Sequence, residues 1–505
     1  MCLSLSGAFA QSADFELQRS LDLARSQQFE QARQALVAAT QRFPSDKRFP
    51  IELAGLSFRS NANSEAIRYL REALRLDPAD EYANNFLASL YLLEGNLDAA
   101  VKYWNRIGKP QINEIHFEPK PRLNPVLLDR NFTFSPASVL RLDDLKTTEA
   151  RLQSLEVLSA PQYSLDARPD GFDFVVRTSE RNGFGNSKAQ ALVRLFRGLP
   201  YQTIYPEYFN IGGTATNVTS LLRWDSNKRR AFVSLSAPLK SKPSFRYRFS
   251  ADFRDENWFF WPDSSFHSRQ FSFGASIDQI VSAQWNWGVG AFLVHDRAPQ
   301  LVSPDLATEG YSLQYRARLE HQFLYLPERR LTISARLSPT LGRNLTASST
   351  FGLLQASTDL NWLPGRRPGD YELNLRFSGG RSFGTLPFSS LFMLGIERDN
   401  DLLLRGHVGT LDGRKGSAPL TRDYLLANAD LTRRVLKSSF FDVRLGPFVD
   451  IARPYRAVQS SDLNRVLVDP GIMLKLRVLG AATVTLTYGR NLHQGRGAFY
   501  ASALQ

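Results

Sequence analysis

From about residue 200 to the end of the chain, apolar and polar residues alternate. The clearest stretch is 245–254, where phenylalanine, tyrosine and alanine occupy every second position and arginine, serine and aspartate lie between them. Successive side chains of a β-strand point to opposite faces. The alternation, which recurs in the segments 331–337, 371–378, 441–444, 472–478 and 483–488, therefore predicts strands with one apolar and one polar face.

Residues 186–505 are predicted to form a transmembrane antiparallel β-barrel of about 16 strands, with 14 as the alternative count. The polar face carries charges such as Lys475 and Arg477, as a water-filled lumen would, and tight turns such as 225–228 alternate with longer loops. We place the strand starts near Tyr201, Thr214, Arg229, Phe245, Ser265, Gln284, Tyr311, Arg330, Thr350, Asp370, Leu391, Asp423, Phe440, Val466, Thr483 and Gly497.

Residues 14–110 repeat with a period of 34 residues. A helix–turn–helix period of this length is typical of tetratricopeptide (TPR) repeats and predicts an all-α solenoid. Gly95 falls at the turn inside the third repeat, with Gln27 and Asn61 at the matching positions. The residues expected to let the helices pack closely, or to end them, are Ala32, Ala66, Ala100, Pro44 and Pro78.

Residues 111–185 have a different pattern, which predicts a small α+β domain. We expect a strand at 112–117, a helix at 138–155 and two strands at 163–167 and 172–178. An Arg-Pro-Asp-Gly turn at 168–171 joins the last two. Residues 1–13 are apolar and end in the Ala-Phe-Ala pattern of an export cleavage site, so we interpret them as a remnant of a signal peptide.

Composition narrows the classes of function. The chain has 505 residues, a formal charge of +13 and a single cysteine, which excludes a disulfide framework and a thiol-rich metal site. Its six histidines are scattered, and no phosphate-binding loop or Gly-x-Ser-x-Gly nucleophile motif is present. We therefore expect no enzyme activity, no cofactor and no metal. The strict alternation of the basic and aromatic residues at 245–254 favours a barrel wall over a surface that binds nucleic acid.

The segment Leu404-Arg405-Gly406-His407 resembles the loop motif of the BamA/TamA superfamily, the outer-membrane insertases and their relatives in two-partner secretion. It lies in the longest expected loop, 397–422, with eleven candidate strands before it and five after it. The resemblance implies that the loop folds into the barrel lumen and that the arginine contacts an acidic residue there. Asp450, in Gly-Pro-Phe-Val-Asp, matches the acidic position, and Asp430 is a second candidate. A planar guanidinium suits such pairing.

The α+β segment at 111–185 resembles a POTRA domain, the periplasmic module that precedes barrels of this superfamily. The resemblance implies a protein of the outer membrane that inserts or translocates client polypeptides, with the N-terminal domains in the periplasm. There the helical repeats would receive clients or a partner protein. An insertase would open laterally between its first and last strands, whereas a secretion pore would pass an extended client through its lumen.

Three other interpretations remain open. The barrel could be a passive porin-like channel that favours anions, or a structural anchor for the repeats. It could translocate surface lipoproteins, although the POTRA-like segment and the loop motif count against this. Alternation would also suit a soluble periplasmic adhesion or scaffold protein with a β-sandwich.

Overall fold

The computed structural model describes residues 3–185, 187–260, 264–298, 306–307, 309–365, 369–438, 440–459, 465–478 and 482–504. They form two compact units. The first unit consists of Met1–His116, Phe134–Leu145 and Tyr163–Val176, and the second consists of Phe117–Thr133, Lys146–Gln162 and Arg177–Gln505. No helix of the described ranges combines the length and the hydropathy that a membrane span requires.

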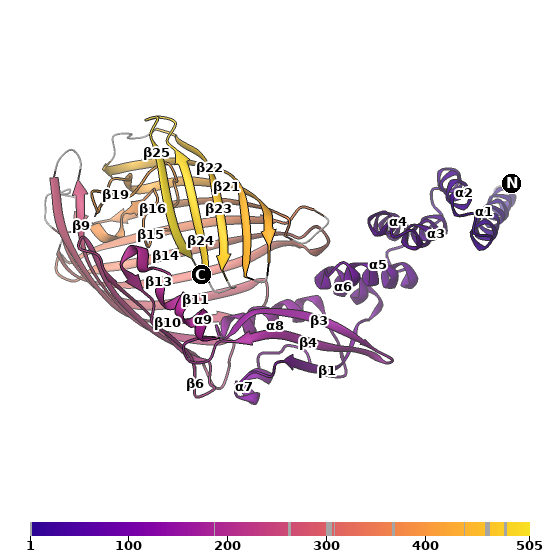
Figure 1. Cartoon of the computed structure of the whole chain (residues 1–505), viewed down its shortest axis with the longest axis horizontal. Helices are drawn as coiled ribbons and strands as arrows, with labels where there is room; N and C mark the ends of the chain where they lie inside the picture. The colour runs from indigo at the N-terminus through magenta and orange to yellow at the C-terminus, as the bar shows by residue number, and fades with distance from the viewer. Residues whose placement is uncertain are drawn as a thin grey trace. The chain divides into compact units, whose positions relative to one another are not determined.

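Paired helices fill the N-terminal part of the first unit (Figure 1). They are α1 (Leu3–Arg25), α2 (Phe29–Arg42), α3 (Arg48–Arg59), α4 (Asn63–Leu76), α5 (Glu81–Leu93) and α6 (Leu97–Trp104). Gln27, Asn61 and Gly95 lie at the turns and have φ of 63°, 57° and 68°, so the same left-handed turn recurs every 34 residues. Ala32, Ala66 and Ala100 have no exposed surface. Pro44 and Pro78 follow the residues that end α2 and α4.

A four-stranded sheet with the order β2-β1-β4-β3 follows the helices. Its strands are β1 (Gln111–Glu118), β2 (Ser138–Val139), β3 (Leu158–Arg168) and β4 (Gly171–Glu180), and α8 (Leu142–Ser154) lies between β2 and β3 in the chain. The helix expected at 138–155 therefore begins four residues late. Ser138 and Val139 pair with Ile112 and Gln111 instead, which takes them out of the helix.

The C-terminal strands form a closed antiparallel barrel, as the alternation predicted (Figure 1). Helix α9 (Lys188–Phe196), which the pattern did not predict, precedes the first strand. The wall strands are β5 (Thr203–Ile204), β6 (Glu207–Ile211), β7 (Thr216–Trp224), β8 (Lys228–Pro238), β9 (Phe245–Phe260), β10 (Ser264–Ile280), β11 (Trp285–Arg297), β13 (Glu309–Leu326), β14 (Leu331–Asn344), β15 (Ser349–Trp362), β16 (Tyr371–Gly384), β21 (Leu420–Lys437), β22 (Phe441–Gln459), β23 (Leu467–Val478), β24 (Ala482–Arg490) and β25 (Gly497–Leu504).

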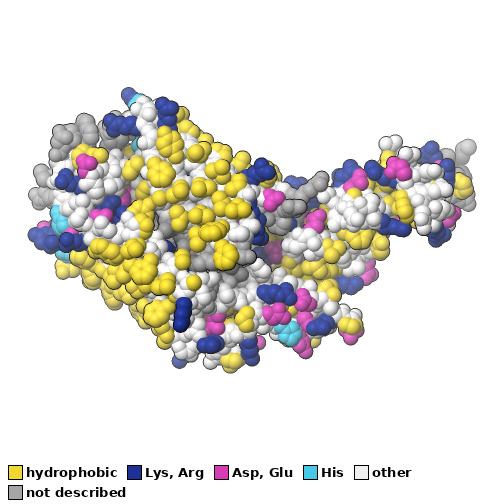
Figure 2. Space-filling model, in the orientation of Figure 1, with side chains coloured by type: hydrophobic (Ala, Val, Ile, Leu, Met, Phe, Trp, Pro, Cys, Tyr) yellow, Lys and Arg dark blue, Asp and Glu magenta, His cyan; other side chains and the backbone are white. Residues whose placement is uncertain are grey.

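The two faces of the barrel wall differ in chemistry as expected. Phe253 of β9 lies opposite Phe271 of β10, and both are exposed on the outer face. The polar residues that alternate with these phenylalanines along the strands, such as Asp252, face inward and form ion pairs with arginines. Figure 2 shows apolar side chains spread over much of the visible barrel surface. This surface has the chemistry that a lipid bilayer requires.

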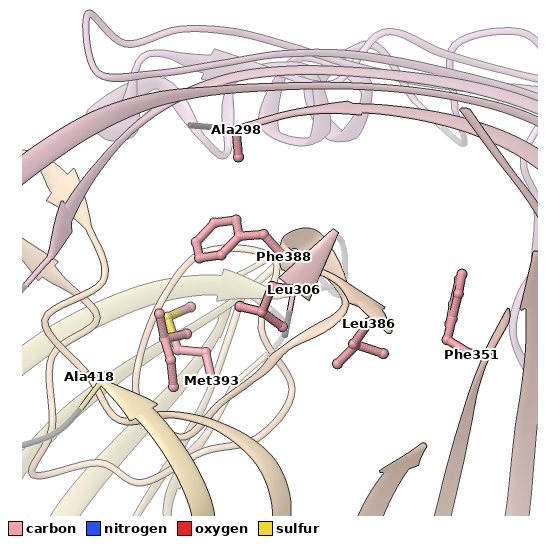
Figure 3. Packing of buried hydrophobic residues seen from close by; sticks show 8 residues of the cluster. Ala298, Leu306, Phe351, Leu386, Phe388, Met393 and Ala418 are labelled. Carbon is pink, nitrogen blue, oxygen red and sulfur yellow. The ribbon is translucent and has the colours of Figure 1, made fainter. Parts of the chain in front are cut away.

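The strand expected to start at Leu391 forms only a short segment of the barrel sheet. Ten residues of β16 pair directly with β21, so the chain between them forms one long loop at 385–419. Only two residues of that region, β18 (Phe392–Met393), pair with β21. The apolar residues around this position are buried in the interior, where Leu386, Phe388 and Met393 pack with Leu306 (Figure 3).

Candidate functional site

The side chain of Arg405 joins the 385–419 loop to two wall strands. Its Nε and Nη2 donate to the two carboxylate oxygens of Asp450 on β22, at 2.8 and 2.6 Å, and its backbone N–H donates to the same carboxylate at 2.8 Å. Nη2 also contacts Asp430 on β21 at 2.6 Å. The guanidinium carbon lies 3.7 Å from the centre of the Phe448 ring. Arg405 is 4% exposed and Asp450 is fully buried, so this is a desolvated, bidentate ion pair.

The two residues after Arg405 bind a third carboxylate, that of Asp469 on β23. The backbone N–H of Gly406 donates to Oδ2 at 2.5 Å, and Nδ1 of His407 lies 2.9 Å from the same atom. On its other side, Nε2 of His407 lies 2.9 Å from the amide nitrogen of Asn491. The amide nitrogen can only donate, so Nε2 accepts and Nδ1 carries the proton. His407 is thus hydrogen-bonded through both ring nitrogens.

Steric fit complements these polar contacts. Leu404 is fully buried and packs with Phe392, Tyr424, Leu426 and Leu467. A Cβ atom at Gly406 would lie 2.6 Å from the backbone nitrogen of Asn491 and 2.6 Å from the carboxylate carbon of Asp469. The backbone approaches the wall closely only because residue 406 has no side chain.

A second set of ion pairs joins the same loop to the first wall strands. Asp399 lies 2.8 Å from Arg223 of β7 and 2.6 Å from Arg230 of β8. Lys228 of β8 pairs with Glu397 at 3.2 Å, and Glu256 of β9 pairs with Lys415 at 2.5 Å. The side chains of Arg223, Lys228 and Glu397 are nearly inaccessible to solvent. The loop is therefore fixed to strands near both ends of the barrel sequence.

These two sets of contacts lie on either side of the seam where β25 meets β5. At the seam, the hydroxyl of Tyr201 donates to the carbonyl of Ala501, and the ring of Tyr201 stacks on that of Tyr500 at 6.5 Å. A cavity of about 480 Å³ is lined by residues of both sets, including Arg405 and Asp399, and by Tyr500. The loop thus spans the seam from the inside.

The structure brings together the residues of the expected loop motif, Leu404 to His407, with Asp450 and Asp430. Asp469, Asn491 and the residues that hold Asp399 were not among the candidates predicted from the sequence. Asp469 lies at a polar position of an alternating strand and could have been a third acidic candidate. Asp399 and its two arginines are 169 or more residues apart in sequence, and no local pattern links them. Within the described ranges, no three potential ligands are grouped for a metal ion.

Comparison with known proteins supports both parts of this architecture. The tetratricopeptide repeat family model matches residues 17–81 and 58–110. A search of curated protein sequences finds no match. Among solved structures, CdiB from Escherichia coli superposes with a TM-score of 0.51 at 13% identity, covering 79% of this chain and 77% of CdiB.

Two further solved structures are similar at a lower level. CdiB from Acinetobacter baumannii gives a TM-score of 0.46 at 12% identity, covering 81% of this chain and 80% of that one. BamA from Haemophilus ducreyi lacking POTRA domains 1–3 gives 0.44 at 13% identity, covering 78% and 85%. The chain is therefore a β-barrel protein with N-terminal helical repeats. Its barrel has the fold seen in CdiB from Escherichia coli, and its N-terminal helices match the tetratricopeptide repeat model.

Proposed function

We propose that this protein resides in the outer membrane and inserts or translocates client polypeptides there. The observation that carries the proposal is the Leu404–His407 motif, docked inside the barrel by Arg405 on Asp450 and Asp430. A plain channel needs no loop that crosses its lumen and is held by desolvated ion pairs. The apolar outer wall supports a location in the bilayer.

Under this proposal, the helical repeats and the β1 to β4 sheet lie in the periplasm and receive the client or a partner protein there. The repeats supply a helical surface of the kind that binds extended segments. The sheet of β1 to β4 acts as the POTRA-like module between the repeats and the barrel, with the boundaries 111–185. Export to this location requires a signal peptide, and the apolar residues 1–13 with their Ala-Phe-Ala pattern fit part of one.

Two routes for the client follow from the site. In lateral opening, β25 and β5 separate and offer unpaired backbone edges to a client strand. Because the loop is fixed on both sides of the seam, wide opening requires one set of ion pairs to break. In passage through the lumen, the loop moves away from the barrel wall completely, and both sets of ion pairs break. The two routes therefore differ in which contacts must be released.

Depletion of the protein, followed by quantitative proteomics of purified outer membranes and of the secreted fraction, tests the proposal. We expect a specific set of barrel proteins or exported proteins to decrease, and that set identifies the clients. An unchanged protein profile with reduced uptake of small anionic solutes would instead establish a passive channel. Solubility of the full chain without detergent would favour the scaffold interpretation.

A further inference from the structure

An arginine-rich pocket of about 620 Å³ lies in the second unit, apart from the loop motif. Its walls come from the residues that follow α8, from the end of β4, from the segment after α9 and from strands β6 to β9. Four arginines and two glutamates line it, namely Arg181, Arg197, Arg230, Arg248, Glu156 and Glu207. The rings of Tyr205, Phe209 and Phe232 complete the lining.

Most of these charges are already paired. Arg197 lies 2.9 Å from Glu207, and Arg248 lies 3.2 Å from Glu156. Arg230 pairs with Asp252 and Asp399. In the described part of the chain, Arg181, which lines the pocket, and the neighbouring Arg194 form no direct ion pair with a carboxylate. Glu207 acts on both at longer range, and Glu156 acts on Arg181. Two arginines at this pocket therefore have no direct ion-pair partner.

One donor of each of these two arginines also lacks a hydrogen-bond acceptor. The Nε atoms of Arg181 and Arg194 are shielded from solvent and have no hydrogen-bond partner among the described residues. Arg194 is only 6% exposed. Burial, together with the nearby charge of Arg181, lowers the pKa of Arg194 to about 10, so it stays protonated at neutral pH. Buried donors without an acceptor are rare in folded proteins, because each carries a desolvation cost.

Neighbouring groups fix these side chains in place. Arg197 donates from Nη1 to the carbonyl of Arg194 at 2.8 Å, and its guanidinium lies 3.8 Å from the centre of the Tyr205 ring. The guanidinium of Arg181 lies 5.1 Å from the centre of the Phe209 ring. Little side-chain entropy is then lost when a ligand binds, which favours affinity.

We propose that this pocket binds a phosphate-type oxyanion. A phosphate group supplies close to two negative charges and several acceptor oxygens, which matches the two arginines without a direct ion-pair partner and their unpaired Nε donors. A carboxylate would supply one charge only. The pocket is larger than one phosphate group, and its aromatic rings leave space for the body of a molecule that carries it. The site is separate from the loop motif, and the proposal does not depend on polypeptide transport.

Calorimetric titration of the full-length protein with inorganic phosphate, in nanodiscs of phosphatidylcholine, tests the site directly. We expect one saturable site whose affinity falls as salt is added. Titration with chloride at equal ionic strength should give no saturable signal. The absence of saturable phosphate binding to the unmodified protein would overturn the proposal without the need for any variant.

Variants assign the binding to the pocket. The double substitution Arg181→Gln with Arg194→Gln should weaken phosphate binding at least about tenfold, because charge-assisted hydrogen bonds are lost. The charge-matched control is Arg329→Gln with Arg414→Gln, which removes two exposed arginines that do not line the pocket and should leave affinity unchanged. An equal loss in both proteins would show a general charge effect and overturn the proposal. Arg194→Lys keeps the charge and should give an intermediate affinity, which guards against misfolding as the cause.

A second titration, in nanodiscs of different lipid composition, distinguishes a lipid headgroup from a free solute as the source of the phosphate. If a lipid headgroup occupies the pocket, phosphatidic acid in the nanodisc, whose headgroup is a phosphomonoester, should weaken the apparent affinity for inorganic phosphate in the unmodified protein. If a free solute occupies it, that affinity should not change with lipid. Binding of an oligoglutamate peptide at the arginines, with no binding of phosphate, would instead show an acidic polypeptide site and overturn the proposal.

Discussion

Arg405 contributes several contacts that no other residue type could make together. Its planar guanidinium reaches Asp450 with two donors and Asp430 with a third contact, while its face lies over Phe448. Because Asp450 is fully buried, its charge has no solvent to stabilise it if the arginine is removed.

We therefore expect Arg405→Ala to release the loop while the barrel stays folded. Removing one partner of a buried ion pair costs about 3–5 kcal/mol. Limited proteolysis of the purified protein should show new cleavage within 385–419, and client levels in the membrane should fall. Arg405→Lys should be intermediate, because a point charge cannot replace the bidentate contact.

Arg414→Ala is the matched control, because Arg414 is an exposed arginine of the same loop. It should change neither proteolysis nor client levels. If Arg405→Ala also leaves both unchanged, the arginine does not hold the loop, and its proposed role is wrong.

Gly406→Ala tests the close approach of the backbone to the wall. The added methyl group would lie 2.6 Å from two atoms of Asn491 and Asp469, so the loop must move away. We expect faster hydrogen–deuterium exchange at residues 404–407. Gly352→Ala on β15, where the nearest described atom lies 3.8 Å from the ideal Cβ position, should have no effect on exchange. Equal exchange in the two variants would show that the contact between residue 406 and the barrel wall tolerates an added methyl group.

The 385–419 loop and the repeat helices show how longer segments acquire their roles. The loop contains apolar residues that pack inside the barrel and charged residues that pair with two groups of strands. Its two sets of contacts involve different partners, so they can be weakened separately.

Asp399→Asn should loosen the loop near the first strands and leave the Arg405 contacts intact. Arg223 would keep a buried charge without its carboxylate, a cost of about 1–3 kcal/mol. Exchange should rise at 396–400 and remain low at 404–407. Asp401→Asn, which removes an exposed carboxylate two residues away, is the control. An increase at 404–407 as large as that at 396–400 would mean that the loop is released as one unit.

The repeat turns allow a test of the helical part. Gly95 has φ of 68°, so Gly95→Ala should destabilise the third repeat by about 1–2 kcal/mol. Gly55 lies inside α3 with no atom within 4 Å of its ideal Cβ position, so Gly55→Ala should stabilise its helix by about 1 kcal/mol. Exchange in the full chain should therefore rise in α5 and α6 for the first variant and fall in α3 for the second. Changes of the same sign would contradict this explanation of the turns.

At the scale of the whole molecule, the apolar outer face of the barrel determines whether the protein is more stable in water or in a bilayer. Phe273 on β10 is 54% exposed, and it lies across from Ala251 and Leu293 on the neighbouring strands. In water such a face would be costly, whereas in a bilayer it is favourable.

Phe273→Arg should therefore reduce assembly into membranes, since an arginine facing lipid costs about 2–4 kcal/mol near the bilayer centre. Ser272→Arg, one residue earlier, points to the other face and lies across from Asp252, so it should be tolerated. The folded fraction can be measured from heat-modifiable electrophoretic mobility of membrane extracts. Equal assembly of both variants would favour the soluble interpretation.

Local patterns were sufficient to predict the repeats and the barrel, because both arise from short-range periodicity. The spacing of Ala32, Ala66 and Ala100 and the alternation at 245–254 reflect which face of each segment is buried. The same reasoning was wrong at Leu391, because apolar residues in a loop that folds inward resemble those of a strand. It was also wrong at Ser138, where two residues pair with β1 instead of joining the helix.

The loop motif and its partner Asp450 could be named from sequence because they resemble a known family. Asp469, Asn491 and the ion pairs of Asp399 depend on strands that are distant in the chain and become neighbours only when the barrel closes. Whether Arg181 and Arg194 have an ion-pair partner likewise depends on where the folded chain places the nearby carboxylates. The periodicity of the sequence determines which residues face inward. Closure of the barrel determines which of these residues contact one another, because residues that pair across the lumen are far apart in the sequence and leave no local pattern.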